Sequence, residues 1–305
     1  MEKKQKISMF LSATLGSFLM VATSGAASSQ LTCGDQRTIG DALRRLRPGG
    51  TLFVSGTCNE NVVIEEQVQN VTFDGQGVAT VSGPDTTAPT FSIRGRGITI
   101  KGFTITGGDS GITVTRSGNA IIDGNIIQTT GDNGITVTDH SSARVVNNTI
   151  QNNASNGVVV SQNSSARIGI LIPDDPVASP NTIQGNGDSG VVVTRSSSAV
   201  IIGNRINNNV VDGVIAVRGS QADIASNDIS GNGRHGIFIN LNSVVNLGND
   251  TGSGIEDLPN TSTVNNASFG LLCVTGGVAD GRLGGLNGNN GPTSFGIGCI
   301  NSLSP

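Results

Sequence analysis

The chain contains no tryptophan and no tyrosine, and nine phenylalanines make up its aromatic residues. Sugar-binding sites commonly stack rings on tryptophan or tyrosine, so a polysaccharide groove here would rely on arginine, asparagine and aspartate. Charged residues are also scarce, at 13%, and the net charge of −4 provides no basic patch for nucleic acid. Beyond the first 27 residues no apolar run approaches the 18 residues or so of a transmembrane segment.

The first 27 residues have the layout of a secretory signal peptide. Met1–Lys6 is basic, residues 7–22 are mostly apolar or small, and small residues follow as far as Ala27. We expect cleavage after Ala26 or Ala27 and an exported protein that is secreted, periplasmic or held at the cell surface.

Four cysteines stand in two pairs, near the two ends of the expected mature chain. An even number of cysteines in an exported protein indicates disulfides, and four cysteines allow three pairings. The repeats described below separate the pairs, which favours Cys33 with Cys58 and Cys273 with Cys299. No Cys-x-x-Cys motif or cluster that includes histidine indicates a zinc site.

Glycine is abundant, with 44 residues, and it marks an internal repeat of 23 residues. Glycines followed by an aliphatic residue recur at steps of 23, 23, 33, 23 and 23. Each repeat holds three short runs in which aliphatic and polar residues alternate, a pattern typical of strands. The repeating glycines are Gly111, Gly134, Gly157, Gly190, Gly213 and Gly236.

Three strands in about 23 residues are too few for a propeller blade and fit a parallel β-helix. Each strand then pairs with its copy about 4.8 Å away, and equal positions stack into ladders. We expect isoleucine, valine and alanine inside, strained turn geometry at the glycines, and a structural asparagine ladder in one turn. The sequence predicts a single-domain, all-β, right-handed parallel β-helix of nine to ten coils. The expected asparagine ladder is Asn125, Asn148, Asn181, Asn204 and Asn227.

Both ends of such a solenoid need covering. Apolar residues at positions 39, 42, 43 and 46 predict an amphipathic helix that starts at Thr38 and ends before Pro48. We interpret it as the N-terminal cap. The expected organisation is a signal peptide at 1–27, the N-terminal cap and first coil at 28–60, β-helix repeats at 61–268, and a C-terminal cap at 269–305.

Several stretches carry a resemblance to a known family. Thr38–Leu43, Pro48–Leu52, Val54–Val62 and Phe73–Gly77 resemble the opening coils of right-handed parallel β-helix proteins of the pectin-lyase-like superfamily, and the repeats from Gly111 onward are similar to its generic repeats. The resemblance implies the fold more than an activity. That superfamily includes polysaccharide lyases, glycoside hydrolases, epimerases, phage tailspikes and adhesins.

Two insertions, Gly169–Pro180 and Asp250–Val264, interrupt the repeat. They leave the coil after the same strand, three coils apart, so we expect them to protrude from one flank about 14 Å from each other. Each carries an acidic pair, Asp174 with Asp175 and Glu256 with Asp257. These acids are candidate calcium or sugar ligands, or simply solvated turn residues. We expect no metal and no cofactor, with calcium left open.

The turn before the repeating glycines holds the sharpest candidate site. Asp188, Asp212 and His235 lie on successive coils, with Arg234 beside His235, so their side chains should be about 5 to 10 Å apart. Two carboxylates about 6.5 to 9.5 Å apart can serve an inverting glycosidase. The arrangement faintly resembles the polygalacturonases, although their Asn-Thr-Asp, Asp-Asp and Arg-Ile-Lys motifs are missing. Aspartate before glycine is also ordinary turn chemistry.

Two functions therefore stay open. The first is a non-catalytic exported or surface scaffold that binds a polysaccharide or cell-surface glycan. The alternative is a polysaccharide lyase or inverting glycoside hydrolase whose catalytic residues are Asp188, Asp212, Arg234 and His235. Regular turns without a dense ionisable cluster favour the scaffold. A groove walled by the insertions, with acids converging in it, would favour the enzyme.

Overall fold

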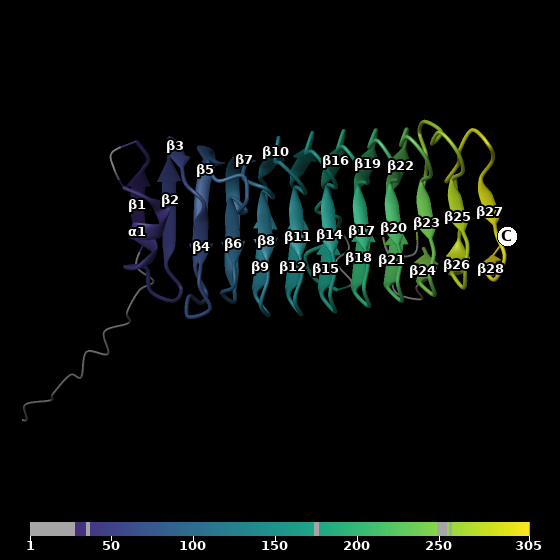
Figure 1. The fold of residues 1–305 in the computed structure, drawn as a ribbon, viewed down its shortest axis with the longest axis horizontal. Helices are drawn as coiled ribbons and strands as arrows, with labels where there is room; N and C mark the ends of the chain where they lie inside the picture. Colours follow the sequence, from purple (N-terminus) through teal and green to yellow (C-terminus); the bar gives the residue numbers. More distant parts are fainter. Residues whose placement is uncertain (1–27, 35–36, 174–176, 249–254, 256–257, 305) are drawn as a thin grey trace, which may run out of the picture.

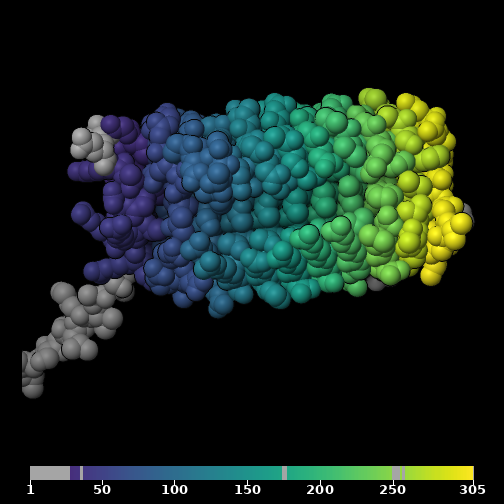
Figure 2. All heavy atoms as spheres, in the orientation of Figure 1, coloured from purple at the N-terminus to yellow at the C-terminus, as the bar shows by residue number. Residues whose placement is uncertain are grey.

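The structure, a computed structural model, describes residues 28–34, 37–173, 177–248, 255 and 258–304. They form an elongated parallel β-solenoid of about eleven coils (Figure 1), slightly longer than the nine to ten expected. The all-β parallel β-helix prediction is confirmed. Figure 2 shows that the residue colours succeed one another in bands along the axis, as expected when each coil contacts mainly its neighbours. The predicted signal peptide, residues 1–27, lies outside the described residues.

Three faces build each regular coil. Among the described residues, face one is a ten-stranded sheet, and an 18-stranded sheet forms faces two and three because β5 and β7 bend from one to the other. Face one consists of β4 (Val62–Ile64), β6 (Phe91–Ile93), β8 (Ile112–Val114), β11 (Ile135–Val137), β14 (Val158–Val160), β17 (Val191–Val193), β20 (Val214–Ala216), β23 (Ile237–Ile239), β25 (Leu271–Cys273) and β27 (Thr293–Phe295).

Face two consists of β1 (Ser28–Thr32), β2 (Thr51–Ser55), the first parts of β5 (Thr72–Gly83) and β7 (Ile98–Gly107), β9 (Asn119–Asp123), β12 (Ser142–Val146), β15 (Ser165–Ile168), β18 (Ser198–Ile202), β21 (Gln221–Ala225), β24 (Val244–Leu247), β26 (Val278–Arg282) and β28 (Ile300–Ser304). Face three consists of β3 (Thr57–Asn59), the ends of β5 and β7, β10 (Ile126–Gln128), β13 (Thr149–Gln151), β16 (Thr182–Gln184), β19 (Arg205–Asn207) and β22 (Asp228–Ser230).

The strand registers reproduce the 23-residue frame. Ile135 pairs with Ile112 on one side and Val158 on the other, and all three side chains are fully buried. These ladders belong to one hydrophobic cluster that runs from Leu31 to Leu286. Burial of stacked aliphatic side chains therefore holds each coil against the next.

The reason that glycine is required at the repeating positions differs from the one expected. None of the six repeating glycines, which run from Gly111 to Gly236, adopts a positive φ. The prediction of strained turn geometry at these positions is therefore wrong. They are instead needed for close packing. A Cβ at Gly190 would lie 2.5 Å from Ile206 Cγ2 and 2.6 Å from the Gly213 carbonyl oxygen, which leaves no room for a side chain.

The expected asparagine ladder is present between faces two and three, and it is fully buried. Asn148 donates its backbone N–H to Asn181 Oδ1 over 2.9 Å and its side-chain amide to the Ile122 carbonyl over 2.8 Å. Asn260 adds a sixth rung beyond the second insertion. Sequence reasoning missed a second ladder, four residues before the glycines, made of Asn153, Asn186, Asn209, Asn232 and Asn266.

The two ends differ from expectation. The capping helix predicted from Thr38 is not supported, because α1 (Ile39–Leu43) is a single five-residue turn, and β1 lies outermost in face two. The segment expected as a C-terminal cap is itself coiled, since β25 and β26 pair with β23 and β24 and then with β27 and β28. Both favoured disulfides, Cys33–Cys58 and Cys273–Cys299, are formed.

The described ends of the two insertions share one packing site. Ile170 of the first insertion is buried with Ile202 and Ala225 in a small satellite cluster, and Ile255 of the second insertion packs against it together with Val200. The insertions thus start on one flank, as expected. The acidic candidates Asp174, Asp175, Glu256 and Asp257 lie outside the described residues.

Candidate functional site

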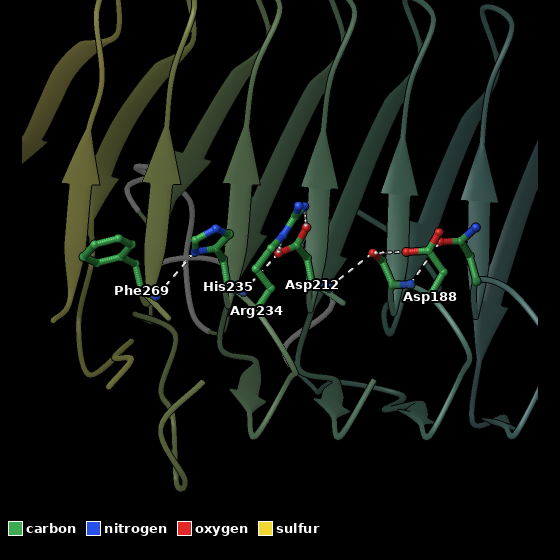
Figure 3. Close-up of polar contacts among 7 residues, drawn as sticks. Asp188, Asp212, Arg234, His235 and Phe269 are labelled. Carbon is green, nitrogen blue, oxygen red and sulfur yellow. Dashed lines mark hydrogen bonds and ion pairs between the residues drawn. The ribbon is translucent and has the colours of Figure 1, made fainter. Parts of the chain in front are cut away.

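The structure aligns Asp188, Asp212, Arg234 and His235 along one edge of face one, where each coil enters its strand (Figure 3). A chain of hydrogen bonds links them. Ser189 Oγ donates to Asp188 Oδ1 over 3.1 Å and accepts from the Asp212 backbone N–H over 3.3 Å. The four candidates therefore lie along neighbouring turns, as the repeat predicts.

The residue just before each repeating glycine forms a ladder of acceptors, which we call the acceptor ladder. Each side chain accepts a hydrogen bond from the backbone N–H of its equivalent in the next coil. Asp212 Oδ1 accepts from His235 over 2.9 Å, and His235 Nδ1 accepts from Phe269 over 3.3 Å. The rungs are Asn133, Asn156, Ser189, Asp212 and His235. Asp212 and His235 thus accept the same backbone hydrogen bond as the asparagines at the equivalent position of earlier coils.

Asp212 is fully buried, and both of its oxygens are occupied. Arg234 Nε donates to Oδ1 over 2.9 Å, and Arg234 Nη2 pairs with Oδ2. The hydrogen bond to Asp212 raises the pKa of Arg234 above its usual value, against the opposing effect of burial. A fully buried carboxylate that accepts three N–H groups has no surface from which to exchange a proton with a substrate.

His235 is only 6% exposed, and it is held between aromatic rings. Its ring stacks on Phe269 at 5.9 Å between centroids and faces Phe238 at 6.1 Å. Burial lowers the pKa of His235, Arg234 lowers it further, and Asp212 partly offsets both effects. The imidazole is therefore neutral at pH 7, which suits Nδ1 as the acceptor for the Phe269 N–H.

Two of the four candidates remain accessible. Asp188 is half-buried, and the Arg234 side chain is 45% exposed, with its guanidinium 5.1 Å from the Phe238 ring centroid. One open carboxylate and one open guanidinium do not make the two-carboxylate acid and base of an inverting glycosidase. The site can bind an anion through Arg234 more readily than it can transfer protons.

The surface beside this turn is apolar. The outward residues in the middle of the face-one strands are partly exposed aliphatic or aromatic side chains from β14 to β25. They offer few hydrogen-bonding groups to a sugar. The row is Val159, Val192, Ile215, Phe238 and Leu272.

A groove that sequence reasoning missed runs across face two and encloses about 380 Å³. It lies between two outward rows, one of short polar side chains that includes Ser165 and one that includes Arg144 and Arg167. The sequence contained a signal for this groove. The position ten residues after the repeating glycine, between two buried positions of the same strand, is an arginine in two successive repeats, Arg144 and Arg167. Val200, in the same row, joins the groove to the satellite cluster under the insertions.

Within the described ranges no three histidine, cysteine, aspartate or glutamate side chains gather where they could hold a metal ion. In the same part of the chain no helix is long and apolar enough to cross a membrane.

Comparisons with known proteins agree with the fold. Three solved structures illustrate the likeness, all at low identity. A pectate lyase, Pel9A, has a TM-score of 0.55 and 14% identity, over 83% of this chain and 77% of its own. The mannuronan C-5 epimerase AlgE6 A-module of Azotobacter vinelandii has a TM-score of 0.51 and 14% identity, over 92% and 89%. A double mutant of the periplasmic alginate epimerase AlgG has a TM-score of 0.52 and 13% identity, over 92% and 84%.

At such identities these structures show a shared pectin-lyase-like fold and no more. None of the curated proteins compared with the sequence matches it. The family described as "Right handed beta helix region" matches residues 51–172 and 161–278, which together span most of the chain. The chain therefore belongs to the family of right-handed β-helix proteins.

Proposed function

We propose that this protein is an exported, non-catalytic β-helix rod that works as an extracellular or surface scaffold and binds glycans. The observation that carries the proposal is the acceptor ladder. Asp212 and His235, the best acid and base candidates, satisfy backbone N–H groups of the next coil, and both are buried. Their conformations are set by the solenoid, so catalysis is not needed to explain them.

Two further observations support export and a glycan partner. A disulfide lies near each end of the described chain, and disulfides persist in oxidising compartments. The three solved structures named above are, by their names, a pectate lyase, a mannuronan epimerase and an alginate epimerase. A shared fold does not transfer their activities, but it makes polysaccharides the first ligand class to test.

The alternative function is a polysaccharide lyase or inverting glycoside hydrolase. The exposed Arg234 guanidinium and the half-buried Asp188 favour it, because they are two reachable ionic groups on the same edge of the solenoid, two coils apart. Such an enzyme would need an acid or base other than buried Asp212.

The test is product release by the purified protein on pectate, alginate and neutral polysaccharides, with and without calcium. Reducing ends report cleavage of either kind, and absorbance of unsaturated products distinguishes lyase chemistry from hydrolysis. We expect no turnover. Asp139, a half-buried aspartate in the turn after β11, provides the control. Turnover that Asp188→Ala or Arg234→Gln abolishes, while a folded Asp139→Ala variant keeps it, would overturn the scaffold proposal in favour of the enzyme.

A further inference from the structure

We infer that the groove on face two is a binding site for a carboxylate-bearing polysaccharide, held along the solenoid axis by Arg144 and Arg167. This inference rests on the proposed function and deepens it by naming a site and a ligand class. The site is on a different face from the Asp188 to His235 turn, so the two can be tested separately.

The shape of the groove fits an extended polymer. Its lining comes from equal positions on β9, β12, β15, β18 and β21, which are successive neighbours in one parallel sheet. Five coils at about 4.8 Å each place its ends about 19 Å apart. A groove that crosses the strands at right angles follows the axis of the rod, so a linear chain can extend along it.

The charge at the arginine end of the groove calls for an anion, while Asp223, in the same outward row two coils beyond Arg167, places a carboxylate at the other end. Arg144 and Arg167 are direct partners in the ladder between β12 and β15, so two positive side chains stand side by side. Like charges at such positions destabilise a sheet. The ion pairs found among the described residues involve Arg94, Lys101, Arg116 and Arg234, and neither groove arginine has a hydrogen-bond partner there. A carboxylate between the two guanidiniums would remove the repulsion.

The chemistry of both walls fits a sugar acid. Guanidinium binds carboxylate through two parallel N–H donors, which is the strongest contact that this groove offers. The opposite row consists of short polar groups, with Ser142, Ser165 and Ser198 on three successive coils, and these hydroxyls can exchange hydrogen bonds with sugar hydroxyls. Beside Arg167 in the next coil stands Val200, whose apolar surface can contact a ring.

The experiment measures binding of end-labelled oligosaccharides by fluorescence anisotropy at fixed salt. The probes are an oligogalacturonate, an oligomannuronate, a sulfated oligosaccharide and a neutral oligoglucoside. The variants are the double substitution Arg144→Gln with Arg167→Gln, and Ser165→Phe, which fills the groove without changing its charge. The matched control is Arg205→Gln with Arg218→Gln, which removes the same charge from exposed positions outside the groove.

We expect an oligouronate to bind, and both groove variants to weaken binding by about tenfold or more. The arginine variant loses charge-assisted contacts, and the phenyl ring of Ser165→Phe blocks the groove. The control pair should keep wild-type affinity, and the neutral probe should not bind. Unchanged affinity in both groove variants, no binding of either uronate, or tighter binding of the sulfated probe would overturn the inference. The scaffold proposal would then still stand or fall on the turnover assay.

Discussion

His235 donates its backbone N–H to Asp212 Oδ1 over 2.9 Å, although the two residues lie 23 positions apart in the sequence. This bond makes a carboxylate part of the structure of the next coil. In the following rung of the ladder, His235 Nδ1 accepts a hydrogen bond from the backbone N–H of Phe269. Substitutions that keep or remove an acceptor at these positions should therefore separate structural roles from catalytic ones.

The first prediction concerns Asp212. Asp212→Ala leaves the buried N–H of His235 without its side-chain acceptor, which should lower the free energy of unfolding by about 1–3 kcal/mol. Asp212→Asn keeps an oxygen at the same place, as Asn133 and Asn156 do, and should lose less, because only the charge opposite half-exposed Arg234 is removed. Urea unfolding followed by circular dichroism measures both. Equal losses in the two variants would contradict the ladder account.

The second prediction concerns pH. The pKa of His235 is lowered in the folded protein, so the unfolded chain takes up a proton first as pH falls below about 6.5. The stability that comes from the neutral imidazole is complete above that pH, and it is lost progressively towards the lower folded pKa.

Thermal unfolding between pH 8 and pH 5 tests this dependence. His235→Asn keeps an acceptor that does not titrate, and it should flatten the decline of Tm below pH 6.5. His140→Asn is the control, because His140 is exposed. A decline as steep in His235→Asn as in the wild type would assign the pH dependence to other groups.

The third prediction concerns the repeating glycines. Gly190→Ala should lower the free energy of unfolding by about 1–3 kcal/mol or more, because the new methyl group meets Ile206 and the Gly213 carbonyl. Gly40→Ala, in the short helix α1, meets nothing closer than 3.6 Å and should be neutral or slightly stabilising. The comparison uses denaturant midpoints. A tolerated Gly190→Ala would show that the coils can move apart at no cost.

The fourth prediction concerns the disulfide Cys273–Cys299. In a solenoid each coil depends mainly on its neighbours, so removing this bond should loosen the last coils and leave the centre intact. Hydrogen exchange on Cys273→Ser with Cys299→Ser should show faster exchange in β25 to β28 and unchanged exchange in β11 to β17. Uniformly faster exchange would mean that the rod unfolds as one cooperative unit.

Sequence reasoning predicted what repeats with the same residue type. The stacked aliphatic rows and the ladder at Asn148 could be found because one side chain recurs at one spacing. The acceptor ladder was missed because asparagine, serine, aspartate and histidine share only an acceptor atom, and that property is invisible to a search for identical residues. Because this shared property was not recognised, Asp212 and His235 were interpreted as candidate catalytic residues.

Other errors came from tertiary contacts. Gly190 looked like a turn residue, whereas its role depends on the distance to Ile206 in the next coil. The amphipathic spacing after Thr38 predicted a longer helix than the single turn that forms. The groove at Arg144 and Arg167 depends on short serines two residues before them on the same strands, a relationship between rows that no single row reveals.

The central claim is that the turn of Asp212 and His235 is structural, and one measurement tests it most directly. Wild type and Asp212→Asn, shown to be equally folded, are incubated with pectate and with alginate, and release of reducing ends and unsaturated products is followed. Our account predicts no product from either protein. Turnover by the wild type that disappears in folded Asp212→Asn would contradict it and make Asp212 a catalytic residue.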